Sequence, residues 1–195
     1  MSWTSPRNRG AFPGREPFWR DRYQFLRGLP ENLRVLLPPE RRDFTEKQRG
    51  GLTQIYFADP ATHFEAWFHW RSSRLELGLH FEKSPPENDA LFDAFDRRIV
   101  EIKFELGDSI ELERWEKGWA RIYETWPCEK IDGAFQERMT ERFARVIGVL
   151  QPMLEDARDD TVLEPAWRIT AGRSLSRLRS TENAPSARRR RLDPD

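Results

Sequence analysis

The sequence predicts an α+β fold, in which a five-stranded antiparallel sheet packs with helices. Three observations support this prediction. Two successive segments between Thr62 and Glu82 alternate strictly between apolar and polar residues. A second alternating pair runs through 110–115 and 119–125, and an amphipathic helical pattern separates the two pairs. With one more strand at 52–58, the order is helices, three strands, helix, two strands and helix, which is typical of an antiparallel sheet with helices on at least one face.

The first alternating pair predicts a β-hairpin with one apolar and one polar face. Its apolar positions are Phe64, Ala66, Phe68, Trp70, Leu75, Leu77, Leu79 and Phe81. A two-residue turn at Ser72-Ser73 would place Phe68 opposite Leu77, and Trp67 opposite Gly78, where a large ring can cover the bare glycine. A slip of one residue would move the apolar set to the other face, so the pattern favours this pairing.

All three histidines of the sequence fall on the polar face of this hairpin. The predicted register pairs His69 with Glu76, Glu65 with His80, and His63 with Glu82. Of these, the residues close enough together to ligate zinc or manganese are His63, Glu65, His80 and Glu82. A solvent-exposed face with favourable His–Glu pairs is the commoner arrangement. We therefore predict no metal and no cofactor, and keep the four residues as a speculative metal set.

The elements after this hairpin are predicted from their end signals. Ser84-Pro85-Pro86-Glu87 has capping-box spacing with proline at the first helical position, and Gly107 ends that helix. In the second hairpin, the loop 116–118 would pair Leu112 with Ile122, Glu113 with Arg121, and Trp115 with Trp119. Asp132 is expected to cap a long helix, which Pro152 should kink or end.

The sequence before this hairpin predicts several short helices and one strand. A helix over 17–27 should end at Gly28, and Pro30 should begin a second helix that runs through Leu36. Residues 43–48 are expected to add one more turn. A strand over 52–58 would place Ile55 opposite Ala66 and Phe57 opposite Phe64. Pieces this short need a sheet or a partner to stabilise them.

The charge distribution divides the chain into three parts. Residues 1–15 carry three arginines and no acid, and residues 171–195 carry seven arginines and three acids. Because the formal net charge of the whole chain is zero, the body at 16–170 carries about −7. We expect disorder at both basic ends and a single α+β domain between them. The tail at Arg188, Arg189, Arg190 and Arg191 can contribute nonspecific contact with nucleic acid.

The composition also indicates the cellular compartment of the protein. Cys128 is the only cysteine, so the chain has no internal disulfide and no cysteine metal cluster. No apolar run approaches the roughly 20 residues of a membrane span, and the N-terminus lacks a hydrophobic signal core. These features lead us to expect a cytoplasmic protein without a membrane partner.

One run from Asn88 reads N-D-A-L-F-D-A-F-D-R-R-I-V-E-I-K-F-E-L-G, and I-E-L-E-R-W and W-A-R-I-Y-E follow it. With these motifs, roughly residues 64–124 resemble a poorly characterised bacterial family of small domains. Those domains occur alone or beside restriction-modification and other DNA-processing proteins. The resemblance implies a DNA-associated accessory role, and it supplies no catalytic residues. The order of elements also resembles small bacterial secretion chaperones, an analogy of fold that does not establish function.

No motif in the sequence assigns a reaction. It lacks a nucleophile elbow, a phosphate loop, a zinc ligand pattern and a dinucleotide fingerprint. Glu111, Glu113 and Glu116 beside Lys117 faintly resemble a nuclease cluster, although Glu113 is better used opposite Arg121. Cys128 has no candidate base nearby in the sequence, so we expect a structural thiol.

Trp67, Trp115 and Trp119 are predicted to lie away from the aliphatic face. Either helices cover that side, the arrangement we favour, or an aromatic surface remains for a partner. We predict a non-enzymatic protein-binding or adaptor module that uses an aromatic sheet or helix surface to bind another protein or a second copy of itself. A DNA-associated accessory or metal-dependent nuclease-like protein is the alternative.

Overall fold

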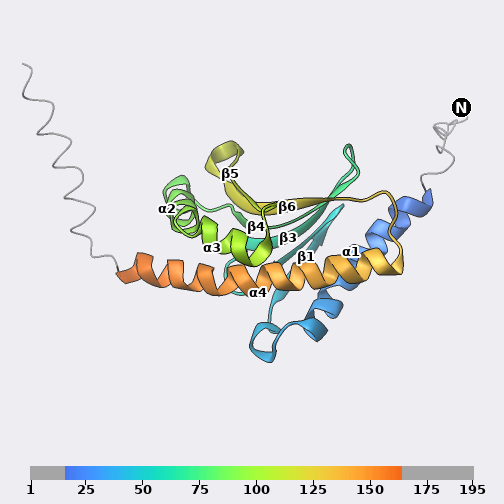
Figure 1. Cartoon of the computed structure of the whole chain (residues 1–195), viewed down its shortest axis with the longest axis horizontal. Coiled ribbons are helices and arrows are strands. Elements are labelled where there is room, and N and C mark those ends of the chain that lie inside the picture. The colour runs from blue at the N-terminus through green and yellow to red at the C-terminus, as the bar shows by residue number, and fades with distance from the viewer. Residues whose placement is uncertain (1–15, 164–195) are drawn as a thin grey trace, which may run out of the picture. The chain divides into compact units, whose positions relative to one another are not determined.

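The computed structural model describes residues 16–163. These residues form one six-stranded antiparallel sheet, in the order β1-β2-β3-β4-β6-β5, and four α-helices (Figure 1). The strands are β1 (Thr45–Arg49), β2 (Leu52–Tyr56), β3 (Thr62–His69), β4 (Arg74–Phe81), β5 (Glu111–Arg114) and β6 (Ala120–Pro127). The helices are α1 (Glu16–Leu36), α2 (Pro85–Asp96), α3 (Ile99–Leu106) and α4 (Gly133–Leu163), with short 3₁₀ turns at Pro39–Arg41 and Glu116–Gly118. The α+β class with an antiparallel sheet is confirmed.

The predicted domain ends lie outside the described residues. Both the basic N-terminus at 1–15 and the Arg-rich tail at 171–195 fall there, as does the domain boundary at 170. One compact unit extends to Ala157, and a second unit comprises 158–195, of which the structure describes only the end of α4. None of the described helices is long and apolar enough to cross a membrane.

The sheet has six strands because residues 45–49 form β1, and the helical turn predicted there is wrong. All five residues of β1 are exposed, so they show no apolar alternation from which a strand could be predicted. The β1–β2 pairing, in which Arg49 lies opposite Leu52, is closed by Gly50-Gly51. Gly50 has a φ of +58°, a conformation that glycine adopts without strain. The Gly-Gly dipeptide was therefore the available signal for this hairpin.

The register of the central hairpin differs from the prediction by two residues. Phe68 lies opposite Leu75, and Trp67 lies opposite Glu76. The connection is longer than the predicted Ser72-Ser73 turn, since the strands end at His69 and begin again at Arg74, and Ser73 has a φ of +49°. A shift of two keeps the side chains of β3 and β4 on their predicted faces, because strand side chains alternate with a period of two. Trp70, predicted on the apolar face, lies beyond the end of β3 and is 63% exposed. The β2–β3 register is shifted by two as well, which places Ile55 opposite Phe64.

Gly78 occupies a close approach between strands. It lies opposite Glu65 on one side and Tyr123 on the other. A Cβ atom at this position would come within 2.7 Å of the Ile122 carbonyl oxygen and of the Tyr123 Cβ. The glycine is therefore required by the spacing of β4 and β6, and it is not covered by Trp67 as predicted.

The second hairpin has the predicted register. Leu112 lies opposite Ile122 and Glu113 opposite Arg121, and the Trp115 N–H donates to the Trp119 carbonyl at 2.7 Å. The loop contains two positive φ values, +61° at Lys117 and +73° at Gly118. This hairpin joins the first through β6, which pairs with β4.

Helix α1 continues through Pro30, where two separate helices were predicted. A proline has no N–H to donate to the carbonyl four residues earlier, which here belongs to Leu26. Gln48 Nε2 at 3.2 Å and Thr53 Oγ1 at 3.0 Å donate to that carbonyl instead. The sheet therefore satisfies the acceptor that Pro30 leaves free, and α1 stays intact.

The other helices begin where they were predicted to begin, but not all of them run unbroken to the predicted end. The Glu87 carboxylate accepts hydrogen bonds from the Ser84 N–H and Oγ at the start of α2, and Asp132 Oδ1 accepts from the Phe135 N–H at the start of α4. The single helix predicted to end at Gly107 is divided into α2 and α3. Helix α4 does not end at Pro152. The carbonyl that Pro152 leaves free belongs to Gly148, which is exposed to water.

All four helices bury side chains in a single core on one face of the sheet. The strands contribute Phe64 and Phe68 from β3, Leu77 and Leu79 from β4, and Ile122 from β6 to this core. Figure 1 shows α4 running the length of the sheet, and α1 crossing near the N-terminal part of α4. The described helices thus lie on one side of the sheet and leave the polar face without a helical cover.

The Pro30 arrangement predicts a stability coupling. Thr53→Val should lower the free energy of unfolding by about 1–2 kcal/mol, because the buried Leu26 carbonyl loses a donor. In a Pro30→Ala background the backbone N–H of the new alanine can donate to Leu26, so the same change should cost less. Urea denaturation of the four proteins measures this coupling, with Thr45→Val on the exposed strand β1 as the control. Equal costs in both backgrounds would contradict the explanation.

Candidate functional site

The candidate site is the face of the sheet that points away from the four helices, called here the polar face. Its side chains come from four central strands and lie in rows set by the register. They are Gln54 of β2, His63, Glu65, Trp67 and His69 of β3, Glu76 and His80 of β4, and Arg121 and Tyr123 of β6. Six of these nine side chains were placed on the polar face of the central hairpin from the sequence: His63, Glu65, Trp67, His69, Glu76 and His80.

Glu76 lies at the centre of the polar face and is only 1% exposed. Both of its carboxylate oxygens are 3.0 Å from Arg121 Nη1. His69 Nε2 lies 2.8 Å from one oxygen, and His80 Nε2 lies 3.2 Å from the other. Burial would raise the pKa of Glu76, but the hydrogen bonds from both histidines and the charges of His80 and Arg121 outweigh it and lower the pKa to about 2. The carboxylate is therefore an ionised group fixed inside the sheet face.

A second buried network joins Gln54, His63 and Glu65. His63 Nδ1 lies 2.8 Å from the Pro60 carbonyl, which can only accept, so Nδ1 carries the proton. The Gln54 amide nitrogen lies 3.0 Å from His63 Nε2 and 2.9 Å from Glu65 Oε2. Burial would raise the pKa of Glu65, but the neighbouring His63, His80 and Gln54 outweigh it, and the pKa lies below its usual range.

The polar face was predicted to be solvent-exposed, and this is wrong at its centre. His63, Glu65, Glu76 and His80 are each at most 5% exposed. The tryptophan rings beside these groups shield them, and the groups satisfy one another through hydrogen bonds. Strand alternation distinguishes apolar from polar positions, but it does not show whether a polar position is buried in a network.

The three tryptophans predicted as partner-binding residues lie together. The ring centroids of Trp67 and Trp115 are 6.4 Å apart, and those of Trp115 and Trp119 are 6.2 Å apart. Trp67 contacts the His69 ring at 4.0 Å, and the Arg121 guanidinium lies 4.5 Å from the Trp115 ring. All three tryptophans are half-buried. The favoured prediction that helices cover this side is wrong for the described helices, and an aromatic surface remains.

A depression of about 320 Å³ opens beside these rings. His63, Glu65 and Gln54 line it from the sheet, Trp67 and Trp115 form its aromatic lining, and Glu82 and Pro60 lie at one end. Lys47 and Arg49 line it from the edge strand β1. These two cations were missed by sequence reasoning because β1 was not predicted, and the Gly50-Gly51 turn was the signal that could have found them.

Three of the four residues in the speculative metal set lie close together. Ligand atoms of His63, His80 and Glu82 all fall within 4.8 Å of one another. Glu65 is outside this group, although its Oε2 lies 3.5 Å from His63 Nε2. His63 and His80 are direct cross-strand neighbours, and their rings stack with centroids 5.5 Å apart. The predicted pairing of Glu65 with His80 is therefore wrong.

The other candidates from the sequence are used elsewhere. Glu113 pairs with Arg121 at 2.8 Å, as predicted, and Glu111 accepts a hydrogen bond from the Tyr123 hydroxyl at 3.2 Å. Within residues 16–163, these carboxylates do not join Glu116 in a group that could hold a metal. Cys128 is buried, and burial raises the pKa of its thiol despite the neighbouring Arg22. Arg188–Arg191 lie outside the described residues.

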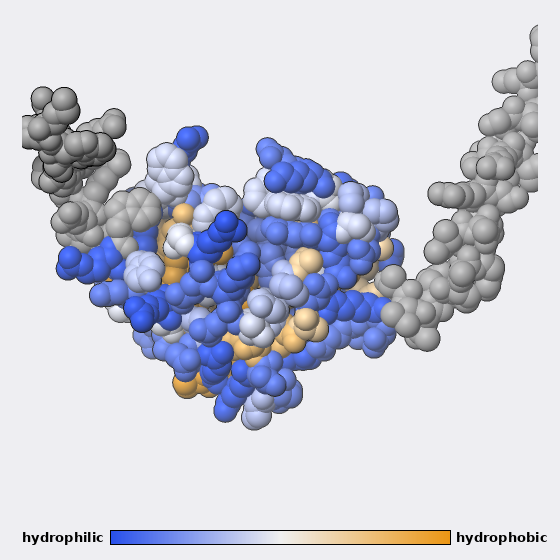
Figure 2. All heavy atoms as spheres, turned by 180° about the vertical axis from the view of Figure 1, so that it is seen from behind, coloured by the Kyte–Doolittle hydropathy of each residue, from blue (hydrophilic) through white to orange (hydrophobic). Residues whose placement is uncertain are grey.

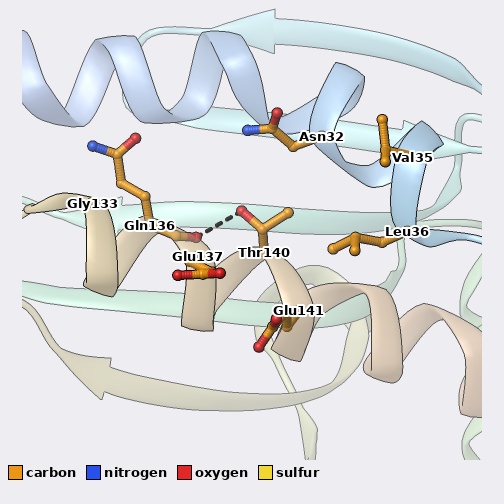
Figure 3. Close-up of a pocket in the computed structure, with 8 residues that line it drawn as sticks. All are labelled: Asn32, Val35, Leu36, Gly133, Gln136, Glu137, Thr140 and Glu141. Atoms are coloured by element: carbon orange, nitrogen blue, oxygen red, sulfur yellow. Dashed lines mark hydrogen bonds between the residues drawn. The ribbon is translucent and has the colours of Figure 1, made fainter.

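A second depression, of about 380 Å³, lies between α1 and α4 (Figure 3). Asn32, Val35 and Leu36 line it from α1, and Leu36 points toward Thr140 of α4 in Figure 3. Val35 is 75% exposed, so this groove has an apolar margin. Gln136, Glu137, Thr140 and Glu141 of α4 line the other side, so the groove combines apolar and polar groups. The surface visible in Figure 2 is mainly hydrophilic, and its hydrophobic residues form small patches.

Comparisons with known proteins bring no relative to this site. No family model matches the chain, no curated protein is similar to it, and no solved structure matches its fold.

The pKa of Glu76 predicts how stability depends on pH. Its folded pKa of about 2 lies below the ordinary value of 4.5, so the ionised carboxylate stabilises the fold above pH 4.5, and this contribution is lost as the pH falls toward 2. Glu76→Gln should remove on the order of 3 kcal/mol at pH 7 and flatten the pH dependence between 4.5 and 2. Urea unfolding across that range measures both effects.

Glu113→Gln is the control for this prediction, because Glu113 also pairs with Arg121 but its side chain is 45% exposed. It should cost at most about 1 kcal/mol and leave the pH dependence nearly unchanged. If Glu76→Gln and the unmodified protein lost stability equally as the pH falls, the buried ion would not be the source of the acid sensitivity.

Proposed function

We propose that this chain is a protein-binding module that holds a segment of a partner protein in the depression on the polar face. The observation that carries the proposal is the pair of half-buried tryptophans, Trp67 and Trp115, beside a 320 Å³ depression that no described helix covers. Concave sites with aromatic walls and a few fixed polar groups are typical of binding sites.

The rings of Trp67, Trp115 and Trp119, called here the aromatic wall, suit a binding surface because they are held in place before a partner arrives. Trp67 packs on His69, and Trp115 lies between Trp67, Trp119 and the Arg121 guanidinium. Glu76 and Glu113 hold Arg121 in turn. A ring that is already ordered loses little conformational entropy on binding, and tryptophan is among the residues that contribute most to protein interfaces.

The charges at the margin favour an acidic partner. Lys47 and Arg49 are exposed on β1, and neither has an ion-pair partner among residues 16–163. Glu65, the nearby buried carboxylate, is bound by Gln54 and lies beside His63. The segment we propose carries an aromatic or aliphatic side chain that packs against Trp67 and Trp115, and an acidic side chain that pairs with the β1 cations.

A displayed library of random peptides tests this proposal. Enriched peptides should combine an apolar residue with an acidic one, and bind in calorimetry with micromolar affinity or better. Lys47→Glu, which changes an exposed edge residue, should weaken binding at least tenfold, and Trp67→Ala should abolish it. Val35→Ser in the α1–α4 groove is the control and should leave affinity unchanged.

Two outcomes would overturn the proposal. One is that no peptide binds the protein above background. The other is that Val35→Ser weakens the selected peptides while Lys47→Glu does not, since the helical groove would then be the binding surface. Light scattering of the protein alone identifies a second copy of the chain as the partner, if the mass doubles and Lys47→Glu returns it to a monomer.

The basic ends of the sequence support a second candidate, a DNA-associated accessory protein. Residues 171–195 carry a net charge of +4 in a chain whose body is acidic, and cations contribute nonspecific affinity for phosphates that salt weakens steeply. A salt titration of duplex DNA binding, with the full chain and with residues 1–170, tests this candidate. Equal binding by both proteins would remove the role of the tail, and no binding at low salt would remove the candidate.

A further inference from the structure

We propose that His63, His80 and Glu82 form a binding site for a divalent transition-metal ion, with Zn²⁺ as the best fit, at the end of the depression on the polar face. This inference goes beyond the proposed function, because it concerns an ion and not a partner protein. It rests on the protonation pattern of the two imidazoles, on the carboxylate beside them, and on access through the depression.

Each of the two histidines has one nitrogen fixed by a protein acceptor, which leaves the other with a lone pair when the ring is neutral. His63 donates from Nδ1 to the Pro60 carbonyl at 2.8 Å, so Nε2 carries the lone pair. His80 contacts the Glu76 carboxylate through Nε2 at 3.2 Å, so that nitrogen donates, and no described hydrogen bond involves its Nδ1. An imidazole held by a carbonyl or carboxylate on its far nitrogen is the usual arrangement of metal-binding histidines.

The third ligand is Glu82, the residue that follows β4. Its backbone N–H is anchored to the Ala61 carbonyl at 2.7 Å. Its side chain is half-buried and lines the depression, and among the described residues its carboxylate has no hydrogen-bond or ion-pair partner. An unpaired carboxylate within 4.8 Å of two buried imidazoles is a group whose negative charge a cation would balance.

The donor set selects the class of metal. Two imidazole nitrogens favour zinc and similar transition metals over Mg²⁺ and Ca²⁺, which prefer oxygen ligands. Ligand atoms around a tetrahedral Zn²⁺ lie roughly 3.3–3.5 Å apart, given metal–ligand distances of about 2.0–2.2 Å. The three groups here lie within 4.8 Å, so they must approach one another, and the unpaired Glu82 side chain is the group free to move.

Besides the movement of Glu82, binding requires a rearrangement beside His63. The Gln54 amide, 3.0 Å from His63 Nε2, must release that nitrogen and keep only its bond to Glu65. The depression that His63 and Glu82 line supplies the entry path, and a fourth coordination position would face the same space. An ion with an open position of this kind could also ligate a carboxylate of a bound partner.

The test uses Zn²⁺ alone and the full chain. Competition against a chromophoric chelator at pH 7.5 should give one ion per chain, with a dissociation constant below 10 µM. His63→Gln and His80→Gln should abolish binding, and Glu82→Gln, at a half-buried position without a side-chain partner, should weaken it at least tenfold. Glu137→Gln on α4 is the matched acid control and should stay within threefold.

Nuclear magnetic resonance of the imidazole nitrogens separates binding from folding defects. His63, His69 and His80 are the only histidines of the chain, so three sets of signals are expected, and Zn²⁺ should shift those of His63 and His80 but not those of His69. Mg²⁺ should shift none. The proposal is overturned if the protein does not bind Zn²⁺ saturably below 100 µM, or if Glu137→Gln weakens binding as much as Glu82→Gln.

Discussion

The buried carboxylate of Glu76 is the group on which the polar face depends. It is almost inaccessible to water, and an isolated charge in that position would be strongly destabilising. His69, His80 and Arg121 compensate for it from three strands, and each is thereby fixed in orientation. Arg121 then supports the Trp115 ring, and His69 supports Trp67. The positions of the aromatic wall and of the proposed metal ligand His80 both follow from where this one charge is held.

The opposite face of the sheet explains why the polar face can remain open. The described helices bury their apolar side chains in one core on one side, so the fold gains its hydrophobic stabilisation without covering the tryptophans. The Leu26 carbonyl links the two halves of this arrangement, because side chains of β1 and β2 complete the hydrogen bonding that Pro30 interrupts. The edge strand β1 is positioned through the same contact, and it carries Lys47 and Arg49 to the margin of the depression.

Much of the fold could be predicted from local patterns, and the errors have physical causes. Alternation placed the residues of β3 and β4 on the correct faces, although Trp70 lies outside β3 and is exposed, and the end signals at Ser84 and Asp132 located two helix starts. Alternation has a period of two, so it could not detect a register shift of two residues at the Ser72-Ser73 connection. The exposed strand β1 had no apolar pattern to reveal it. The burial of Glu76 and His80 was missed because it depends on rings and partners that neighbouring strands bring from elsewhere in the sequence.

The account is tested most directly by the ionisation of Glu76 itself. Carboxyl carbon resonances, assigned by comparison with Glu76→Gln, report the protonation of each side chain as the pH is lowered. The structure predicts that the Glu76 signal does not titrate near its ordinary pKa of 4.5 and stays that of an ionised carboxylate down toward pH 2, or until the protein unfolds. A titration step near pH 4.5 in the folded protein would show that Glu76 is neither buried nor paired, and would contradict the arrangement of the polar face.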